Sequence, residues 1–581
     1  MDMNKIQQYL NNVINNINKQ LFKKQTKIKF IQLNTLKYLS IIAVFSIKTS
    51  FNIKNFWINL VKKTIKCNTK KKFLYVFCIG LFNCIATTPF SIIIILPITF
   101  GSLFYILEHQ QNQTLKHQVI TITSFLFGHF VSIFWWLFIP LTTDFIHLFW
   151  ITPFAILGLP FLFSIIFLPF FILFFKLWCY VFEKNKFVIK CLTIFNIDYT
   201  KIKDLKLFFV FLLSWFCGDY VRGHIIFGGF PWMMFGHFVN YSFAFQSVKL
   251  FGVDIYSIFF LSLVLIPYFF IFKRNNIVVK KVSYTIFALW IINCVVGLFI
   301  ITVSKPTQIK ANIVASQANI PATLQEEITA NEILSKNVSL ISWSAYSNHN
   351  TIMLMPESAI NMPVRSGDYN VKHIANIIPN NQSILIAGGV DYNQFTNKLY
   401  NVSYAINSDG YIVDVYHKQK LVPFGEYLPF REILPEGIIN ITGMSLDFSS
   451  DGDNDLFILY RNLPVIYPTI CYESIFPQYV KKNIKKSRKQ LKTIAQEDNN
   501  KSFIPLKERG EIIINLTNDA WLKWSVGPYQ HFLMARFLAV YTGLPVVRVS
   551  NNGISAYIEK TGVVKTQTGL NKEDILYVKN I

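Results

Sequence analysis

The chain has 581 residues, of which 52% are hydrophobic, and its formal net charge is +24. Soluble globular chains rarely combine such an apolar composition with 56 phenylalanines, so the composition argues against an ordinary soluble protein and favours a membrane protein. Nucleic-acid binding would also account for the charge, but it requires a folded module, and the sequence contains no such motif.

Residues 1–72 form a basic extension whose only acidic residue is Asp2. Its apolar run IIAVF (41–45) is too short to cross a bilayer, which takes about 20 apolar residues. The segment does not resemble a signal peptide, because its basic part is too long and no small-residue cleavage site follows. We expect a cytoplasmic extension held near an anionic lipid surface.

Seven apolar runs between residues 73 and 304 predict a transmembrane domain of about seven spans, because each approaches the length of a membrane-crossing helix. They cover residues 73–90, 91–107, 121–141, 149–178, 205–221, 254–272 and 282–303. Lysines gather in the loops after the fourth and sixth runs, whereas the opposite loops hold only Arg222 and Lys249. The positive-inside rule then places the basic extension in the cytoplasm and everything after residue 304 on the outer face.

The fifth run ends in GDYVRGHIIFGGFPW (218–232), which places Asp219 and Arg222 at a predicted helix end. One interpretation is anchoring at the membrane interface, where arginine and aromatic residues are common. The alternative is a contact with a lipid headgroup or with the domain that follows.

Residues 305–581 predict a separate domain of the α+β or α/β layered type, because short apolar strands alternate with helical text. The predicted strands cover residues 311–317, 351–357, 383–390, 400–407, 463–471, 511–519 and 544–551, and the predicted helices cover 321–338 and 527–543. The lysine-rich stretch 481–502 has no strand pattern and predicts a solvated, charged insertion or loop.

Three chemically distinct side chains stand at predicted strand ends or turns of this domain, where functional residues are common. Glu357 ends one strand, Lys418 precedes a Pro-Phe-Gly turn, and Cys471 ends another strand. A cysteine, a glutamate and a lysine together provide a nucleophile, a general base and a cation that stabilises an oxyanion.

Cys471 is the last of the eight cysteines and the only one after residue 300. A disulfide is therefore not expected, and two interpretations are open: an inert buried thiol or a reactive thiolate. A helix beginning at Tyr472 would direct backbone N–H groups toward the sulfur and favour the thiolate.

At these residues the sequence resembles the nitrilase (carbon–nitrogen hydrolase) superfamily, and within it the bacterial apolipoprotein N-acyltransferases. The segments that carry the resemblance include PESAI (356–360), YHKQKLVPFGEYLPF (416–430), CYESIFP (471–477) and NLTNDAWLKWSVGPYQH (515–531). The resemblance extends over roughly residues 73–581 and implies a nitrilase-like α-β-β-α sandwich joined to a multispan α-helical membrane domain.

The resemblance also implies a reaction at the outer face of a bacterial inner membrane. Cys471 would take an acyl chain from a membrane phospholipid as a thioester and pass it to the α-amine of a diacylglyceryl-cysteine in an apolipoprotein. Glu357 would be the general base and Lys418 the oxyanion stabiliser. Glu426, Tyr472 and Glu473 match further positions of the site, and neither a metal nor another cofactor is implied.

Three features depart from the family pattern. The chain ends in LYVKNI without a further apolar span, and QEEI (325–328) stands where relatives often place a tryptophan. The extension 1–72 and the insertion 481–502 are also atypical. The alternative functions are a membrane-tethered nitrilase-like amidase and a catalytically inactive scaffold. The seven apolar runs disfavour the first alternative, and the presence of all three candidate catalytic residues disfavours the second.

Overall fold

The computed structural model describes residues 67–110, 114–142, 151–178, 180–181, 204–273, 275–322, 328–343, 349–433, 447–450, 456–497 and 509–579, with a few positions between 55 and 64. Residues from Cys67 onward form one compact unit, separate from Met1–Lys66. Almost all of the basic extension, most of the loop after the fourth apolar run, most of QEEI and residues 498–502 lie outside the described residues.

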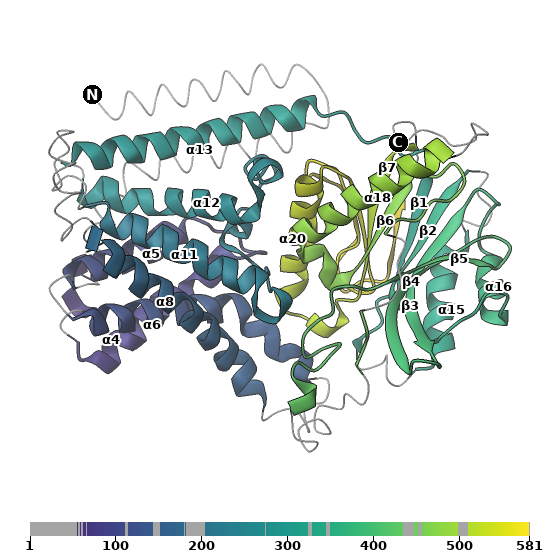
Figure 1. Ribbon diagram of the computed structural model, residues 1–581, viewed down its shortest axis with the longest axis horizontal. Coiled ribbons are helices and arrows are strands. Elements are labelled where there is room, and N and C mark those ends of the chain that lie inside the picture. Colours follow the sequence, from purple (N-terminus) through teal and green to yellow (C-terminus); the bar gives the residue numbers. More distant parts are fainter. Residues whose placement is uncertain are drawn as a thin grey trace. The chain divides into compact units, whose positions relative to one another are not determined.

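Helical segments occupy all seven of the predicted apolar runs (Figure 1). They are α4 (Thr69–Leu81) with η1 (Phe82–Ala86), α5 (Ile95–His109), α6 (Leu115–Phe134) with η2 (Trp135–Thr142), η4 (Phe154–Gly158) with α8 (Leu159–Trp178), α11 (Lys206–His224), α12 (Val248–Phe272) and α13 (Ile277–Val303). Four stretches of the described residues are long and apolar enough to cross a membrane: Leu115–Thr142, Phe154–Trp178, Val248–Phe272 and Ile277–Val303. The multispan membrane domain is therefore confirmed, while the count of seven spans and their orientation stay predictions.

Close backbone contact joins α4 to α6. A Cβ atom added at Gly128 would lie 2.0 Å from the carbonyl oxygen of Phe77, and one added at Gly80 would lie 2.2 Å from that of Phe125. Small residues of this kind allow helices to approach closely where lipid removes the hydrophobic driving force between them.

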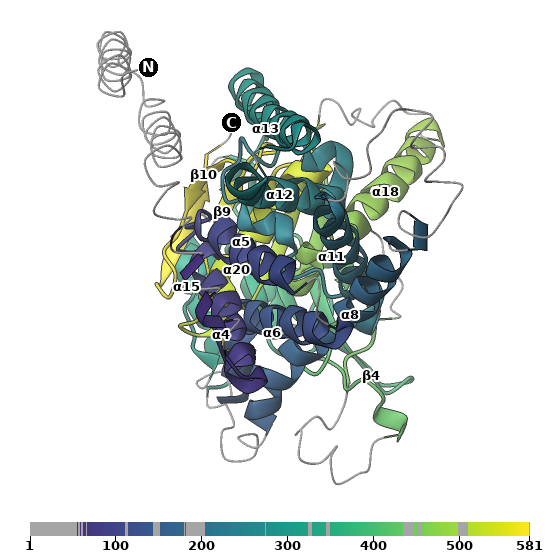
Figure 2. The same cartoon turned by 90° about the vertical axis from the view of Figure 1, so that its left-hand side faces the viewer.

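Helix α13 is packed differently from its neighbours. Only 6% of the most apolar part of α13 is buried, compared with 72% of the most apolar part of Leu115–Thr142. Figures 1 and 2 both place α13 at the edge of the helical bundle with α12 beside it. Its apolar side chains therefore face outward along most of its length, as expected for a helix in contact with lipid.

The second half of the chain is a sandwich of two sheets. The six-stranded sheet has the order β11-β1-β2-β3-β4-β5, and the five-stranded sheet has the order β10-β9-β8-β7-β6. Their strands are β1 (Asn312–Gln317), β2 (Thr351–Ile360), β3 (Ile384–Asn393), β4 (Lys398–Ile406), β5 (Ile412–His417), β6 (Val465–Ile470), β7 (Glu511–Thr517), β8 (Val546–Ser550), β9 (Ala556–Ile558), β10 (Val564–Gln567) and β11 (Asp574–Val578).

Alternation along the strands builds the layers, since successive side chains of a strand point to opposite faces. Ile352 and Leu354 of β2 pack between the two sheets, while Met353 and Met355 pack on the other face. Helices α15 (Ala330–Ile341) and α16 (Tyr369–Ala375) cover that face, and α18 (Pro477–Glu497) and α20 (Gly527–Thr542) cover the outer face of the second sheet. The predicted α-β-β-α sandwich is thus confirmed (Figure 1).

The segment expected to be a solvated loop, 481–502, is instead helical as far as Glu497. Val480, Ile484 and Leu491 recur on one face of α18 and are buried against the second sheet, while the lysines occupy the opposite face. The expectation was wrong because the apolar residues are few and widely spaced among lysines. All seven predicted strands are present, whereas the short strands β5, β9, β10 and β11 were not predicted.

Candidate active site

Glu357 lies near the end of β2 with 7% of its surface exposed. Its carboxylate accepts hydrogen bonds from Lys418 Nζ at 3.2 Å, from Asn401 Nδ2 at 2.9 Å and from the backbone N–H of Asn518 at 2.9 Å. The neighbouring strand approaches so closely that a Cβ atom at Gly388 would lie 2.5 Å from the Glu357 Cα. The carboxylate is therefore held in one position by contacts from three separate segments.

Lys418 directly follows β5 and is 1% exposed. Its ammonium group contacts Glu357 at 3.2 Å and Glu426 at 2.8 Å. Burial alone would lower the pKa of Lys418, but the two carboxylates outweigh it and raise the pKa above its ordinary value. The site therefore contains a permanent buried cation.

Cys471 follows β6 at the point where the chain turns sharply. Its φ of +47° lies in the left-handed region, which a non-glycine residue adopts only when its surroundings enforce it. Its carbonyl oxygen accepts hydrogen bonds from Ser474 Oγ at 2.9 Å, from a ring nitrogen of His531 at 3.2 Å and from Asn515 Nδ2 at 3.4 Å. These side chains fix the backbone that carries the thiol.

The thiol of Cys471 is electrostatically coupled to both other members of the predicted triad. Burial and the charge of Glu357 raise its pKa, and Lys418 opposes them only in part. The helix after it is a single five-residue 3₁₀ turn, Cys471–Ile475. The expected bias toward a thiolate is therefore not found, and reaction requires a base to remove the proton.

The two additional glutamates occupy different places. Glu426 belongs to the cluster, because it accepts from Lys418, from Asn401 at 2.8 Å and from the backbone N–H of Val422 at 2.8 Å. Glu473 is fully buried and has a different set of hydrogen-bond partners. It accepts from the backbone N–H groups of Ile470, Gln419 and Lys420 and from the Tyr416 hydroxyl, with the Ile470 and Gln419 bonds both at 2.8 Å.

Glu473 thereby ties the segment after Lys418 to the turn that carries Cys471. Burial raises its pKa, although hydrogen bonds from Ile470 and Gln419 oppose this effect. Glu473 accepts from backbone N–H groups of both segments, so its carboxylate sets the spacing of two strand ends instead of contacting the thiol.

Tyr472 contacts the helical half. Its hydroxyl donates to the Gly229 carbonyl at 3.3 Å, and its ring stacks near Phe230. Arg222, 1% exposed, donates to the Phe230 and Trp232 carbonyls and to Asp219. The buried Asp219–Arg222 pair therefore supports the loop that contacts Tyr472. This position agrees with the predicted contact with the second domain and not with anchoring at the membrane interface.

A second link joins the two halves at Gln530 of α20. Its side-chain oxygen accepts the indole N–H of Trp136 at 3.1 Å and that of Trp232 at 2.7 Å. The next residue, His531, bonds the Cys471 carbonyl, so the nucleophile turn and the helical half share one helix as support.

Several residues of the site carried no individual prediction. Asn401 bridges Glu357 and Glu426. Asp519 pairs with a ring nitrogen of His531 at 2.9 Å and with the guanidinium of Arg548, and all three side chains are buried. Asp519 and His531 stand in the NLTNDAWLKWSVGPYQH segment, but a position in a motif does not indicate which atoms meet in three dimensions. Asn401 gave no signal beyond its place in a strand.

Neither a disulfide at Cys471 nor a metal site is present among the described residues. Cys471 is a free thiol, as the sequence suggested. Within the described ranges, no group of three or more histidine, cysteine, aspartate or glutamate side chains is arranged to hold a metal ion.

Comparison with known proteins assigns both halves. The carbon-nitrogen hydrolase family model matches residues 352–579, and the apolipoprotein N-acyltransferase N-terminal domain model matches residues 79–266. The apolipoprotein N-acyltransferase of Rickettsia prowazekii (strain Madrid E) is 31% identical over 83% of this chain and 86% of its own length. The apolipoprotein N-acyltransferase of Rickettsia bellii (strain RML369-C) is 31% identical over 77% of this chain and 80% of its own length.

Among solved structures, Saccharomyces cerevisiae Nit3, a member of branch 10 of the nitrilase superfamily, aligns with 47% of this chain and 91% of its own at 16% identity and a TM-score of 0.33. At that score the fold assignment depends on the sheet order and the family models instead. Identity near 30% across both halves is the stronger finding, because it includes the helical domain as well as the sandwich. The chain therefore belongs to the apolipoprotein N-acyltransferase family.

Proposed function

We propose that this protein transfers an acyl chain from a membrane phospholipid to the α-amine of an N-terminal diacylglyceryl-cysteine in apolipoproteins. The observation that carries the proposal is the cluster of Glu357, Lys418 and Cys471, whose two charged side chains are buried, in a chain with membrane-crossing helices. The names of the similar proteins support the substrate class. Both substrates carry acyl chains that lie in the bilayer, so a site attached to such helices can meet both.

In the first half-reaction, Glu357 takes the proton of the Cys471 thiol while the sulfur attacks the carbonyl carbon of a phospholipid ester. The oxyanion that forms is stabilised by the Lys418 ammonium and by the backbone N–H that follows the nucleophile. Collapse of this tetrahedral intermediate breaks the ester C–O bond, and the leaving alkoxide takes the proton from Glu357. The products are a lysophospholipid and a thioester on Cys471.

In the second half-reaction, the α-amine of the acceptor attacks the thioester carbonyl. Glu357 removes the amine proton, Lys418 again stabilises the oxyanion, and the sulfur leaves and recovers the proton. The raised pKa of Cys471 favours protonation of the leaving sulfur, and Glu357 returns to it the proton taken from the amine.

Apolar side chains beside the cluster support a lipid substrate. Phe424 and Phe430 flank Glu426 in sequence and are 60% and 65% exposed. Their ring centroids lie 5.7 and 6.4 Å from that of Phe227, which belongs to the helical half. Exposed aromatic rings grouped in this way favour contact with hydrocarbon. We further propose that the domain faces the periplasm from a bacterial inner membrane, as the lysine distribution predicts.

The decisive experiment traps the acyl-enzyme. Full-length protein in detergent is incubated with phospholipid carrying a labelled acyl chain, without acceptor. We expect label on the protein that hydroxylamine removes, and none on the Cys471→Ala variant. Cys217→Ala, which removes a free thiol of the helical half, is the matched control and should label normally. Labelling of the Cys471→Ala variant, or conversion of a diacylated to a triacylated lipopeptide by it, would refute the nucleophile assignment.

A further inference from the structure

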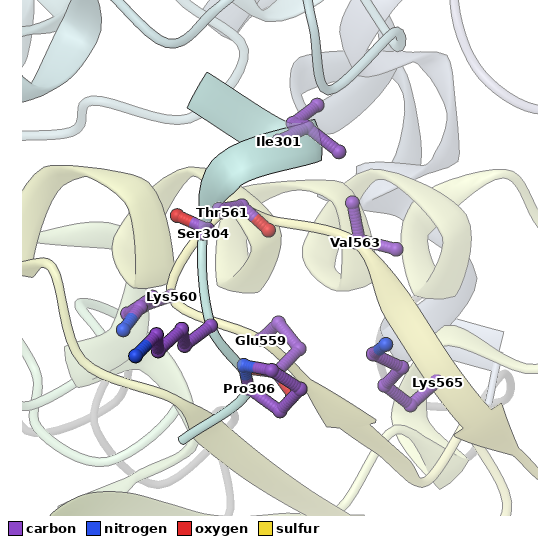
Figure 3. A pocket seen from close by; sticks show the side chains of 9 residues that line it. Ile301, Ser304, Pro306, Glu559, Lys560, Thr561, Val563 and Lys565 are labelled. Atoms are coloured by element: carbon purple, nitrogen blue, oxygen red, sulfur yellow. The ribbon is translucent and has the colours of Figure 1, made fainter. Parts of the chain in front are cut away.

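A cavity of about 60 Å³ opens where α13 ends and meets the turn between β9 and β10. Lys305, Glu559, Lys560 and Lys565 contribute to its wall, and none of them belongs to the catalytic cluster. Figure 3 shows Lys560 and Lys565 on either side of Glu559, next to the chain that leaves the helix at Ser304.

The charged side chains of this cavity have no ion-pair partners among the described residues. In the described part of the chain, none of the three lysines lies within ion-pair distance of an acidic group. Glu559 is 4% exposed; one of its oxygens accepts weakly from Thr307 at 3.4 Å, and the other has no hydrogen-bond partner. A wall with three free ammonium groups and one unpaired acceptor suits a ligand that carries both an anion and a hydrogen-bond donor.

Hydrogen bonds within the protein hold one wall of the cavity in place without a ligand. The turn that carries Glu559 and Lys560 is fixed by Gln246, which donates to the Thr561 carbonyl at 2.8 Å, and by Ser242, which donates to the Gly562 carbonyl at 3.0 Å. Both donors belong to the helical half. Lys560 is thus carried by a turn that two hydrogen bonds fix to the helical half.

The flank of α13 beside Ile301, which lines the cavity, is apolar and exposed. Its residues Ile291, Val295 and Leu298 are 46%, 58% and 37% exposed. Acyl chains of bilayer lipids must cover this face, since water does not reach the hydrocarbon core. The headgroup of a lipid lying along α13 would then arrive at Ser304–Pro306, where the lysines gather.

We propose that this cavity binds the headgroup of one phospholipid whose acyl chains lie on α13. The phosphate sits among the ammonium groups of Lys305, Lys560 and Lys565, and a donor of the headgroup, an ammonium or a hydroxyl, reaches the free oxygen of Glu559. This lipid site is separate from the acyl-transfer site, and the inference does not depend on the proposed reaction.

The test compares lipid retention by full-length protein in detergent, measured by native mass spectrometry. The probe is dioleoyl phosphatidylglycerol, and dioleoylglycerol supplies the same chains without phosphate. A cation near an anionic headgroup contributes about fivefold in affinity, so Lys305→Gln/Lys560→Gln/Lys565→Gln should bind the phospholipid roughly tenfold to hundredfold more weakly. The matched control, Lys482→Gln/Lys486→Gln/Lys489→Gln on the exposed face of α18, should bind like the wild type.

Each other outcome overturns the proposal. Equal retention by the two triple variants would show that net charge, and not this cavity, holds the lipid. Equal retention of dioleoylglycerol and phospholipid by the wild type would show that the chains alone bind. Displacement of the phospholipid by millimolar inorganic phosphate would assign the cavity to free phosphate. Retention by a Glu559→Gln variant is a second measurement. This variant keeps an acceptor oxygen and all three lysines, so it should retain more phospholipid than the Lys305→Gln/Lys560→Gln/Lys565→Gln variant.

Discussion

Asp519 allows a test of the buried group that supports the Cys471 turn, because it pairs with His531, which bonds the Cys471 carbonyl, and with Arg548. Burial alone would raise its pKa, but Arg548 and His531 outweigh burial and lower the pKa from 3.8 to about 2. The charge is therefore favoured by roughly 2–3 kcal/mol in the folded protein. The Asp519→Asn substitution removes the negative charge and its stabilising free energy. It also leaves the Arg548 guanidinium, which is 0% exposed, without its carboxylate partner. Breaking a buried pair on one side costs about 3–5 kcal/mol.

The assay is thermal unfolding of the full-length protein in detergent. For a domain of this size ~1 kcal/mol moves the midpoint by about 2–4 °C, so a cost of about 3–5 kcal/mol should lower the midpoint by roughly 6–20 °C at neutral pH. Because the pKa is depressed on folding, the stabilisation is complete above about pH 4 and is lost as the pH falls through 2. The Asp519→Asn/Arg548→Met double variant should lose less than the sum of the single variants. An unchanged midpoint for Asp519→Asn at pH 7, or strictly additive losses, would refute the reasoning.

Three further outcomes are expected. Glu357→Gln should slow formation of the acyl-enzyme by about 10²–10⁴-fold, because the amide still accepts from Asn518 but takes no proton; labelling at the normal rate would exclude Glu357 as the base. Without substrate, iodoacetamide should alkylate Cys471 slowly at pH 7 and faster as the pH rises, because its pKa is raised; fast alkylation at neutral pH would contradict this. Gly128→Ala should destabilise the helical half by about 1–3 kcal/mol, because its Cβ atom would lie 2.0 Å from the Phe77 carbonyl oxygen, whereas Gly158→Ala, where the nearest atom is 3.5 Å away, should unfold like the wild type.

The segments of regular structure were largely predictable because their signals are local. Long apolar runs marked the helices from α4 to α13, and short apolar runs marked β1 to β4 and β6 to β8. Of the missed strands, β9, β10 and β11 have only 3, 4 and 5 residues, and most residues of β5 and β10 are only partly buried, so their composition differs little from that of loops. Helix α18 was missed because lysines outnumber the three apolar residues that hold it to the second sheet.

The sequence by itself determined which side chains could do chemistry: a glutamate, a lysine and a lone cysteine at strand ends, behind helices apolar enough for a membrane. Only the tertiary structure decided what each one contacts. Lys418 sits between two carboxylates, Glu473 spaces two backbones, and Tyr472 faces the helical half. The physical reason is distance along the chain. Periodicity is read over a few residues, whereas the charge on Lys418 and the pKa of Cys471 depend on groups that strand pairing and the packing of the two sheets bring together from segments scores of residues apart.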